Sequence, residues 1–306
     1  MQFAQLAPFT ASDGENLALY EWQPDDDLGG ELATCKTAPR GVVLIVHGLG
    51  EHAGRYEHVA RRLMAWGFMV RSYDQRGHGE SGGARGALPT DTALLDDLAD
   101  VVDFSRAHCN TLVHALALKG VVLNPPPLIL LGHSLGGLVA GCFVSLNMRP
   151  VDGLVMSSPA LDAGLGALRT WALQLAHRFM PGLSVPNGLN PQFLSRSADV
   201  VKAYLADPLV HNRISARLGQ FIRLAGPKTI AAAARWRTPT LLMYAGDDRL
   251  VNPLGSARFA AYGLHRAPPG TLTAQRFDGL FHEIFNAVDV GPVFATLQRW
   301  LDARFP

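Results

Sequence analysis

The sequence of 306 residues is poor in cysteine, with only Cys35, Cys109 and Cys142. An odd and low number of cysteines does not describe a disulfide framework. No Cys-x-x-Cys pair and no Cys/His cluster has the spacing of metal ligands. We therefore expect buried apolar cysteines that bind no metal.

Excess charge and long apolar runs are also missing. The formal net charge is +1, so there is no electrostatic basis for nucleic-acid binding. No apolar run approaches the ~18 residues that a membrane span requires. The first eight residues, MQFAQLAP, lack the basic and apolar regions of a secretory signal. These absences predict a cytoplasmic protein, and the hydrophobic content of 48% excludes a disordered chain.

Short apolar runs alternate with amphipathic helical patterns along most of the chain. The runs are too short for helices and rich in β-branched residues, which is typical of buried parallel strands. The alternation predicts an α/β fold with a mostly parallel, doubly wound sheet and helices on both faces. The expected strands are 42–46, 68–73, 128–131, 154–156, 241–244 and 275–277.

One of the helical patterns carries aspartates between its apolar positions. The apolar residues Leu94, Leu98 and Val101 recur at helical spacing. Three carboxylates between them could suggest a cluster, but a solvated helix face is the expected role. These are Asp96, Asp97 and Asp100.

The alternation of strands and helices lapses between residues 161 and 236. This stretch contains helical patterns and several prolines but no convincing buried strand. We interpret 161–236 as a helical insertion, and 1–160 with 237–306 as the core that carries it.

A candidate nucleophile lies between an apolar strand and a helix expected over 138–146. Gly132-His133-Ser134-Leu135-Gly136 matches the nucleophile-elbow pattern G-x-S-x-G. Gly79-Glu80-Ser81-Gly82-Gly83 matches it too, but follows a polar loop and leads into another. The elbow requires a strand, a strained turn and a helix, so Ser134 is predicted as the nucleophile and Ser81 as a turn residue.

A serine nucleophile needs a base, and in this fold the order is Ser, then Asp or Glu, then His. His282 follows the last expected strand and precedes the final helix, which predicts it as the base. Of the other histidines after Ser134, His265 suits an exposed loop, and His177 and His211 fall in the insertion. The adjacent Asp247 and Asp248 follow the strand 241–244, and either could be the acid.

Acyl transfer also needs two donors for the oxyanion. One is expected to be the N–H of Leu135, the residue after the nucleophile. The glycine-rich loop after the first core strand should supply the second, which we assign to the N–H of Leu49. His47 and His52 of this loop do not have zinc-site spacing, and we expect them to have structural roles.

Several segments together resemble the monoacylglycerol lipase and lysophospholipase family of α/β-hydrolases (serine aminopeptidase S33-like). They are HGLGEHAGRY at 47–56, DQRGHGES at 74–81, GHSLGG at 132–137 and YLADPLV at 204–210. The resemblance runs from about residue 14 to 300. It implies an α/β-hydrolase core with a helical cap that cleaves single-chain acyl esters without a cofactor. It also selects Asp248 as the acid, because the family acid immediately precedes an Arg-hydrophobic pair.

The resemblance implies further site residues. Glycerol-binding groups carry over to Glu51, Arg55, His133 and Tyr204, although a buried structural ion pair is an equal alternative for Glu51 with Arg55. In the family the cap often touches membranes with an apolar face. Such a face, or one packed on the core instead, is expected from Trp171, Leu175, Phe179, Met180 and Leu183.

The predicted function is a serine esterase that cleaves monoacylglycerols or similar esters through an acyl-enzyme on Ser134. Its partners are then a small lipid or ester substrate and, transiently, a membrane surface. Alternatives are a carboxylesterase for short-chain, aromatic or xenobiotic esters, a lysophospholipase, or a prolyl aminopeptidase. A non-catalytic receptor on the same fold is disfavoured because all expected catalytic groups are present.

Overall fold

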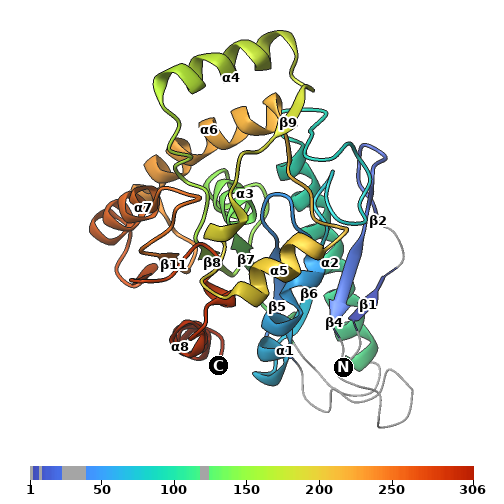
Figure 1. Cartoon of the computed structure of the whole chain (residues 1–306). Coiled ribbons are helices and arrows are strands. Elements are labelled where there is room, and N and C mark those ends of the chain that lie inside the picture. The colour runs from blue at the N-terminus through green and yellow to red at the C-terminus, as the bar shows by residue number, and fades with distance from the viewer. Residues whose placement is uncertain (1–2, 7–8, 23–38, 118–123) are drawn as a thin grey trace.

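The computed structural model describes residues 3–6, 9–22, 39–117 and 124–306. Within them, eight strands form one sheet in the order β1-β4-β6-β5-β7-β8-β11-β12 (Figure 1). The pairs from β6 to β12 are parallel, whereas β4 is antiparallel to both β1 and β6. The strands are β1 (Phe3–Gln5), β4 (Leu19–Trp22), β5 (Val42–Val46), β6 (Met69–Tyr73), β7 (Leu128–His133), β8 (Gly153–Ser157), β11 (Thr240–Ala245) and β12 (Leu272–Phe277).

Helices cover both faces of this sheet, as the alternating pattern predicts. Alternate residues of β5 show this, because Val42, Leu44 and Val46 pack on one face and Val43 and Ile45 on the other. The first face is covered by α2 (Ala93–Ala117), α3 (Leu135–Ser145), α6 (Ala216–Ala232) and α7 (Pro253–Arg266). The second is covered by α1 (Glu57–Ala65) and α8 (Gly291–Arg304).

The sheet and helices differ from the expectation mainly at their ends. The first turn of α3 begins at Leu135, directly after Ser134, and β12 begins three residues before the expected 275. His265 lies in the last turn of α7, not in a loop. The antiparallel strands β1 and β4 were not predicted. The short pairs β2 (Phe9–Thr10) with β3 (Asn16–Leu17) and β9 (Ser184–Pro186) with β10 (Arg213–Ser215) form separate small sheets.

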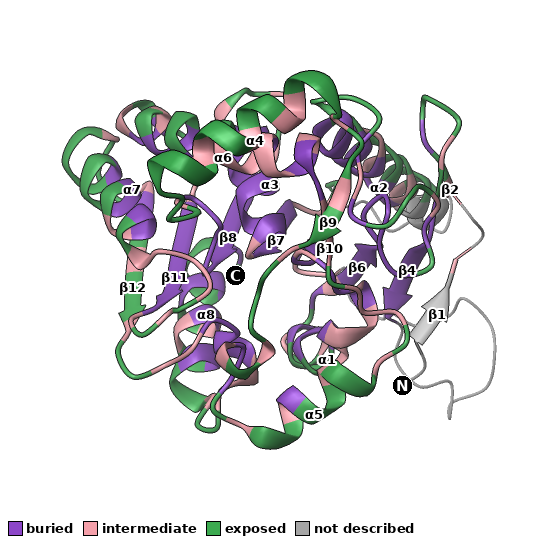
Figure 2. Cartoon of the chain, turned by 45° about the horizontal axis from the view of Figure 1, so that its top comes forward, coloured by how far each residue is buried: buried purple, intermediate pink, exposed green. Residues whose placement is uncertain are grey.

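The segment 161–236 adds helices above the carboxyl ends of the core strands. Its other elements are α4 (Ala167–Phe179), α5 (Ala198–Ala206) and the 3-10 turns η2 (Pro191–Phe193) and η3 (Ala233–Arg235). The remaining 3-10 turns of the chain are η1 (Ala53–Tyr56) and η4 (Ile284–Asn286). The helix α4 has no buried residue and lies at the outer edge of the molecule, beyond α6 (Figures 1 and 2).

The expectation for Asp97 was wrong. Its side chain is 1% exposed, and its Oδ1 lies 2.6 Å from Nη2 of buried Arg76. Asp96, by contrast, is exposed as expected, and Asp100 is partly so. Burial raises the pKa of Asp97 despite the opposing effect of Arg76. The pair ties α2 to the loop after β6, which the helical spacing of Asp97 could not show.

The structure bears on the expectations for the cysteines and for membrane-spanning segments. Cys109 and Cys142 are free and buried in the apolar core, as expected, while Cys35 lies outside the described residues. Among the helices of the described chain, none is both long and apolar enough to cross a membrane.

Candidate active site

Ser134 occupies a strained turn between β7 and α3. Its φ of +52° is rare for a residue with a side chain. The turn requires close contact with the first core strand, since a Cβ on Gly136 would lie 2.0 Å from the Val46 carbonyl oxygen. Glycine at 136 therefore lets α3 begin directly behind Ser134, and the turn presents this side chain at the carboxyl end of the sheet.

His282 and Asp248 meet at the same edge of the sheet. The Nδ1 atom of His282 lies 2.7 Å from Oδ2 of Asp248, and both side chains are almost fully buried. The other carboxylate oxygen, Oδ1, accepts hydrogen bonds from the N–H groups of Leu250 and Val251, both at 2.9 Å. These contacts fix the carboxylate, so that His282 donates from Nδ1 and keeps Nε2 for proton transfer.

The charges of this pair stabilise each other. Burial opposes both charges, but the attraction between the side chains outweighs it. The pKa of Asp248 is therefore lowered and that of His282 is raised from their ordinary values. A base with these properties is held ready to become an imidazolium.

The alternative acids and bases lie elsewhere. The carboxylate of Asp247 points to Arg196, 3.1 Å away, and is half exposed. His177 is partly buried and contacts Asp91, an exposed residue, at 3.2 Å. His211 lines the same cavity as Ser134, but its Nδ1 accepts the N–H of Arg213 at 3.1 Å. Only His282 of these histidines pairs with a buried carboxylate among the described residues.

Ser81, the other match to the elbow pattern, has a structural role. Its hydroxyl donates to the Asp74 carbonyl at 2.5 Å and accepts the N–H of Ala18 at 2.8 Å. The side chain is buried and both of these bonds tie neighbouring loops together. The single proton of the hydroxyl is donated to the Asp74 carbonyl, so no base is placed to remove it.

Two backbone donors border the cavity at Ser134. Leu135 is the first residue of α3, so its N–H has no partner inside the helix. Within the described part of the chain, neither this N–H nor that of Leu49 donates to another protein group. The loop of Leu49 is held by the carboxylate of Glu51, which accepts the Gly48 N–H at 2.5 Å.

His47 and His52 hold this loop in place through hydrogen bonds to neighbouring segments. Nε2 of His47 accepts the N–H of Gln75 at 2.8 Å. Nε2 of His52 lies 2.8 Å from Oδ2 of Asp207. Across the described residues, no group of three or more His, Cys, Asp or Glu side chains could hold a metal ion.

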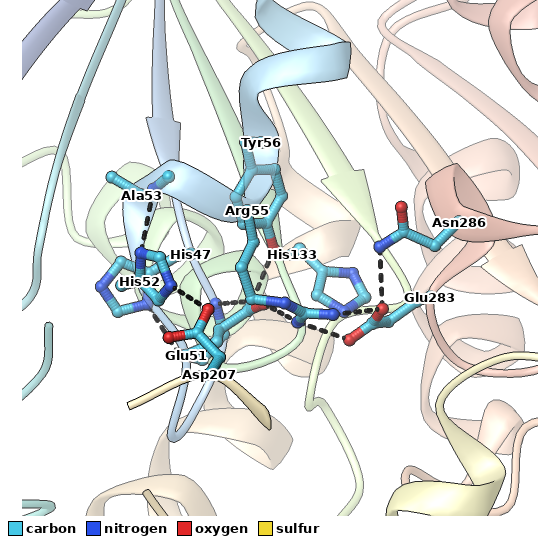
Figure 3. Close-up of polar contacts among 12 residues, drawn as sticks. His47, Glu51, His52, Ala53, Arg55, Tyr56, His133, Asp207, Glu283 and Asn286 are labelled. Carbon is cyan, nitrogen blue, oxygen red and sulfur yellow. Dashed lines mark hydrogen bonds and ion pairs between the residues drawn. The ribbon is translucent and has the colours of Figure 1, made fainter. Parts of the chain in front are cut away.

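Glu51, Arg55 and Glu283 form a cluster of charged side chains (Figure 3), and all three line the same cavity as Ser134. Arg55 pairs with Glu51 and also contacts both carboxylate oxygens of Glu283, at 2.7 and 2.9 Å. Burial would raise the pKa of Glu51, but the charge of Arg55 outweighs it and lowers the pKa to about 2. The expected Glu51–Arg55 ion pair is present, and Glu283 was not predicted from the sequence.

The residues expected at the head group share one cavity with Ser134 and His282. The cavity has a volume of about 500 Å³. Glu51, Arg55, His133 and Tyr204 line it, together with residues of the loops that carry Leu49 and His282. Nδ1 of His133 lies 3.1 Å from the Ser157 hydroxyl, and Tyr204 stacks on the guanidinium of Arg55 at 4.8 Å. Burial and the neighbouring His282 lower the pKa of His133 to about 4, so it is neutral at pH 7.

The sequence and the fold can be compared with known proteins at this point. The family model described as Hydrolase_4 (serine aminopeptidase, S33) matches residues 37–289. The chain belongs to this family. This membership and the fold of the described residues confirm the resemblance and the α/β-hydrolase fold expected from the sequence.

The similarity to several relatives extends over most of this chain and of each relative. A monoacylglycerol lipase of Mycolicibacterium smegmatis is 32% identical and covers 96% of this chain and 95% of its own. The human monoglyceride lipase is 25% identical, with coverages of 99% and 92%. The crystal structure of the Paleococcus ferrophilus monoacylglycerol lipase is 32% identical, with a TM-score of 0.73 and coverages of 88% and 96%.

Proposed function

We propose that this protein is a serine esterase that hydrolyses monoacylglycerols to fatty acid and glycerol. The observation that carries the proposal is that Ser134, His282 and Leu49 line one cavity, while the N–H groups of Leu49 and of Leu135, next to Ser134, are unused. The similarity to monoacylglycerol lipases over nearly the whole chain supports this substrate class.

In the proposed reaction, the Ser134 hydroxyl attacks the ester carbonyl while Nε2 of His282 takes its proton. Asp248 keeps His282 in the required tautomer and stabilises the imidazolium. The N–H groups of Leu49 and Leu135 stabilise the oxyanion, and each such donor contributes about 3 kcal/mol. His282 then protonates the departing alcohol, and a water molecule releases the fatty acid from Ser134 in a second, equivalent step.

The cavity is lined by both polar and apolar side chains. Glu51, Arg55 and Tyr204 are among the polar ones, and the segment 161–236 and the loop after β11 contribute apolar side chains. Burial of each methylene contributes about 0.8 kcal/mol, so these apolar side chains favour an acyl chain. The apolar lining residues are Leu189, Leu194, Leu205, Val210 and Leu250. We propose that 161–236 is a cap that contributes to this lining.

A comparison of three substrates tests the proposed function. We expect kcat/KM to be highest for a medium-chain monoacylglycerol, lower for a short-chain 4-nitrophenyl ester, and negligible for a proline arylamide. The reason is that only the first substrate has both hydroxyl groups for the polar lining residues and a long acyl chain for the apolar ones. The measurement is steady-state kinetics with each substrate below its critical micelle concentration. Equal or faster hydrolysis of the ester or the arylamide would instead support a general carboxylesterase or an aminopeptidase.

We also propose that the cap contacts membranes through α4. Leu168, Trp171, Leu175 and Phe179 recur at spacings of three and four residues, which places them on one side of this helix. Leu168 and Trp171 are 78% and 60% exposed. The opposite side faces α6, where Leu173 contacts Gly219. The outward apolar stripe therefore does not serve packing within the described chain, which favours the membrane role.

Replacing Leu168 and Trp171 by serine should weaken binding to neutral phospholipid vesicles by at least tenfold. The double change removes two large apolar side chains, each worth about 1.5–3 kcal/mol when buried in an apolar phase. Vesicle co-sedimentation measures binding, and hydrolysis of a water-soluble short-chain ester should stay unchanged. A matched control is Leu264→Ser, an exposed leucine of α7. Equal binding of the double variant and the wild type would refute the role of α4.

A further inference from the structure

The only cationic side chain in the cavity lining is already fully engaged. Among the described lining residues, Arg55 is the single arginine or lysine. Glu51 and Glu283 both pair with its guanidinium, and the ring of Tyr204 covers one of its faces at 4.8 Å. An incoming anion would have to break one of these pairs to reach a positive charge.

The carboxylates outnumber this guanidinium. The charged side chains of the lining are Glu51, Asp207 and Glu283 against Arg55, three negative groups and one positive. Of the three lining histidines, His282 has a raised pKa despite its burial, because of the charge of Asp248. Counting it as charged still leaves three negative groups against two positive ones, and the other two histidines add no positive charge. Burial, with the neighbouring charges of His282 and Arg85 respectively, lowers the pKa of both His133 and His211 to about 4. The cavity therefore carries a net negative charge at neutral pH.

The carboxylate-rich cluster lies next to the candidate nucleophile. A Cβ placed on Gly48 would lie 2.7 Å from Oε1 of Glu51 and 3.2 Å from Cβ of Ser134, so Glu51 and Ser134 flank the same glycine. Glu283 directly follows His282 and is only 5% exposed. Asn286 donates to its Oε2 at 2.8 Å, which fixes the carboxylate in place (Figure 3).

We propose that Glu283 is a specificity-determining residue that restricts the enzyme to single-chain esters of uncharged alcohols. Hydroxyl groups can donate to carboxylates, whereas a phosphate group meets like charges and no free cation. The carboxylate of Glu283 enforces this by occupying the side of Arg55 that would otherwise bind phosphate. The inference rests on the proposed function and separates its monoacylglycerol form from the lysophospholipase alternative.

Glu283→Gln tests this role with three esters of the same acyl chain length. They are a 1-monoacylglycerol, a lysophosphatidic acid and a 4-nitrophenyl ester. We expect the wild type to prefer the monoacylglycerol to the lysophosphatidic acid by at least about 100-fold in kcat/KM, given the excess of negative charge at the site. In the variant, this preference should fall by about tenfold or more, because Arg55 keeps only Glu51 as an anionic partner. The 4-nitrophenyl ester has neither a phosphate group nor a glycerol hydroxyl, so its hydrolysis measures any general loss of catalysis in the variant, and the two other rates are compared relative to it.

Two further variants act as controls. Glu283→Asp keeps the negative charge and should retain the preference. Glu57→Gln removes a carboxylate that is paired with Arg61 on the exposed side of α1, outside the cavity, and should leave the preference unchanged. Thermal melting shows that each variant is folded. The wild-type preference tests the proposal even if Glu283→Gln does not fold.

The possible results separate the proposals. Comparable wild-type rates on lysophosphatidic acid and monoacylglycerol would overturn the specificity role of Glu283. An equal loss for all three esters in Glu283→Gln, with an unchanged preference, would overturn it too, because it would show that Glu283 only positions His282. A wild type inactive on every ester would contradict the proposed function itself, and the inference with it.

Discussion

Ser134→Ala is expected to reduce kcat for ester hydrolysis by about 10⁶-fold, the loss typical of removing the nucleophile of such a triad. The variant should fold, because a smaller side chain removes little from a half-exposed position. The remaining Leu49 and Leu135 N–H groups and the cavity should still bind substrate, so the loss is expected in kcat and not in KM. Stopped assays with a monoacylglycerol measure the rate, and a fluorophosphonate probe should no longer label the protein.

The sequence provides a matched control for this change in Ser81, which fits the same five-residue pattern. Ser81→Ala should remain active and lose about 1–3 kcal/mol of stability, because the Ala18 N–H and the Asp74 carbonyl lose a buried partner. Chemical denaturation measures this loss. Full activity of Ser134→Ala, or inactivity of a folded Ser81→Ala, would contradict the assignment of Ser134.

Asp248→Asn should lower kcat by about 10⁴-fold, because an amide whose oxygen stays on the Leu250 and Val251 N–H groups presents an NH2 group to Nδ1 of His282 and favours the wrong tautomer. The pH profile should change as well. Asp248 raises the pKa of His282, and activity requires neutral His282, so activity increases as the pH rises through this pKa. Without the negative charge the pKa falls, and the acidic limb of kcat/KM should shift to lower pH. Measurements of kcat/KM between pH 4 and 9 in both proteins test the shift.

The adjacent Asp247 gives a control of the same chemistry. Its half-exposed carboxylate contacts Arg196, and Asp247→Asn should change activity by no more than about twofold. If Asp247→Asn lost more activity than Asp248→Asn, the assignment of the acid would have to be exchanged.

The parallel core of the sheet could be predicted because strands that are buried on both faces have a recognisable sequence pattern, a short run of apolar residues. The strands β5, β7 and β11 are buried throughout, and each contains an uninterrupted apolar run, at 42–46, 128–131 and 241–243. The edge strands β1 and β4 have no such pattern. Phe3–Gln5 has three residues, and Leu19–Trp22 contains the buried Glu21, whose charge made a strand unlikely from local sequence alone.

The parts of the site that could be predicted are those in which a residue's role depends on the residues next to it in the sequence. Ser134 lies between glycines that the turn requires, and the N–H of Leu135 follows by position. Glu283 and Asp97 were missed or misassigned because their partners, Arg55 and Arg76, lie 228 and 21 residues away. A carboxylate carries no local mark of a distant ion pair, so only the fold shows that these two are buried.

The contacts of the proposed cap with the core have a mechanical consequence. The Gly50 carbonyl accepts the N–H of His211 at 2.9 Å, and the N–H of Glu283 donates to the Leu194 carbonyl at 2.8 Å. The strap 194–211 is thus fastened at one end to the oxyanion loop and at the other to the loop of the catalytic base. Because both hydrogen bonds join this strap to loops of the catalytic centre, a displacement of the strap would be transmitted to the oxyanion loop and to the loop of His282 together. The helix α4 is joined to neither loop by these bonds, so a displacement of α4 would leave them in place.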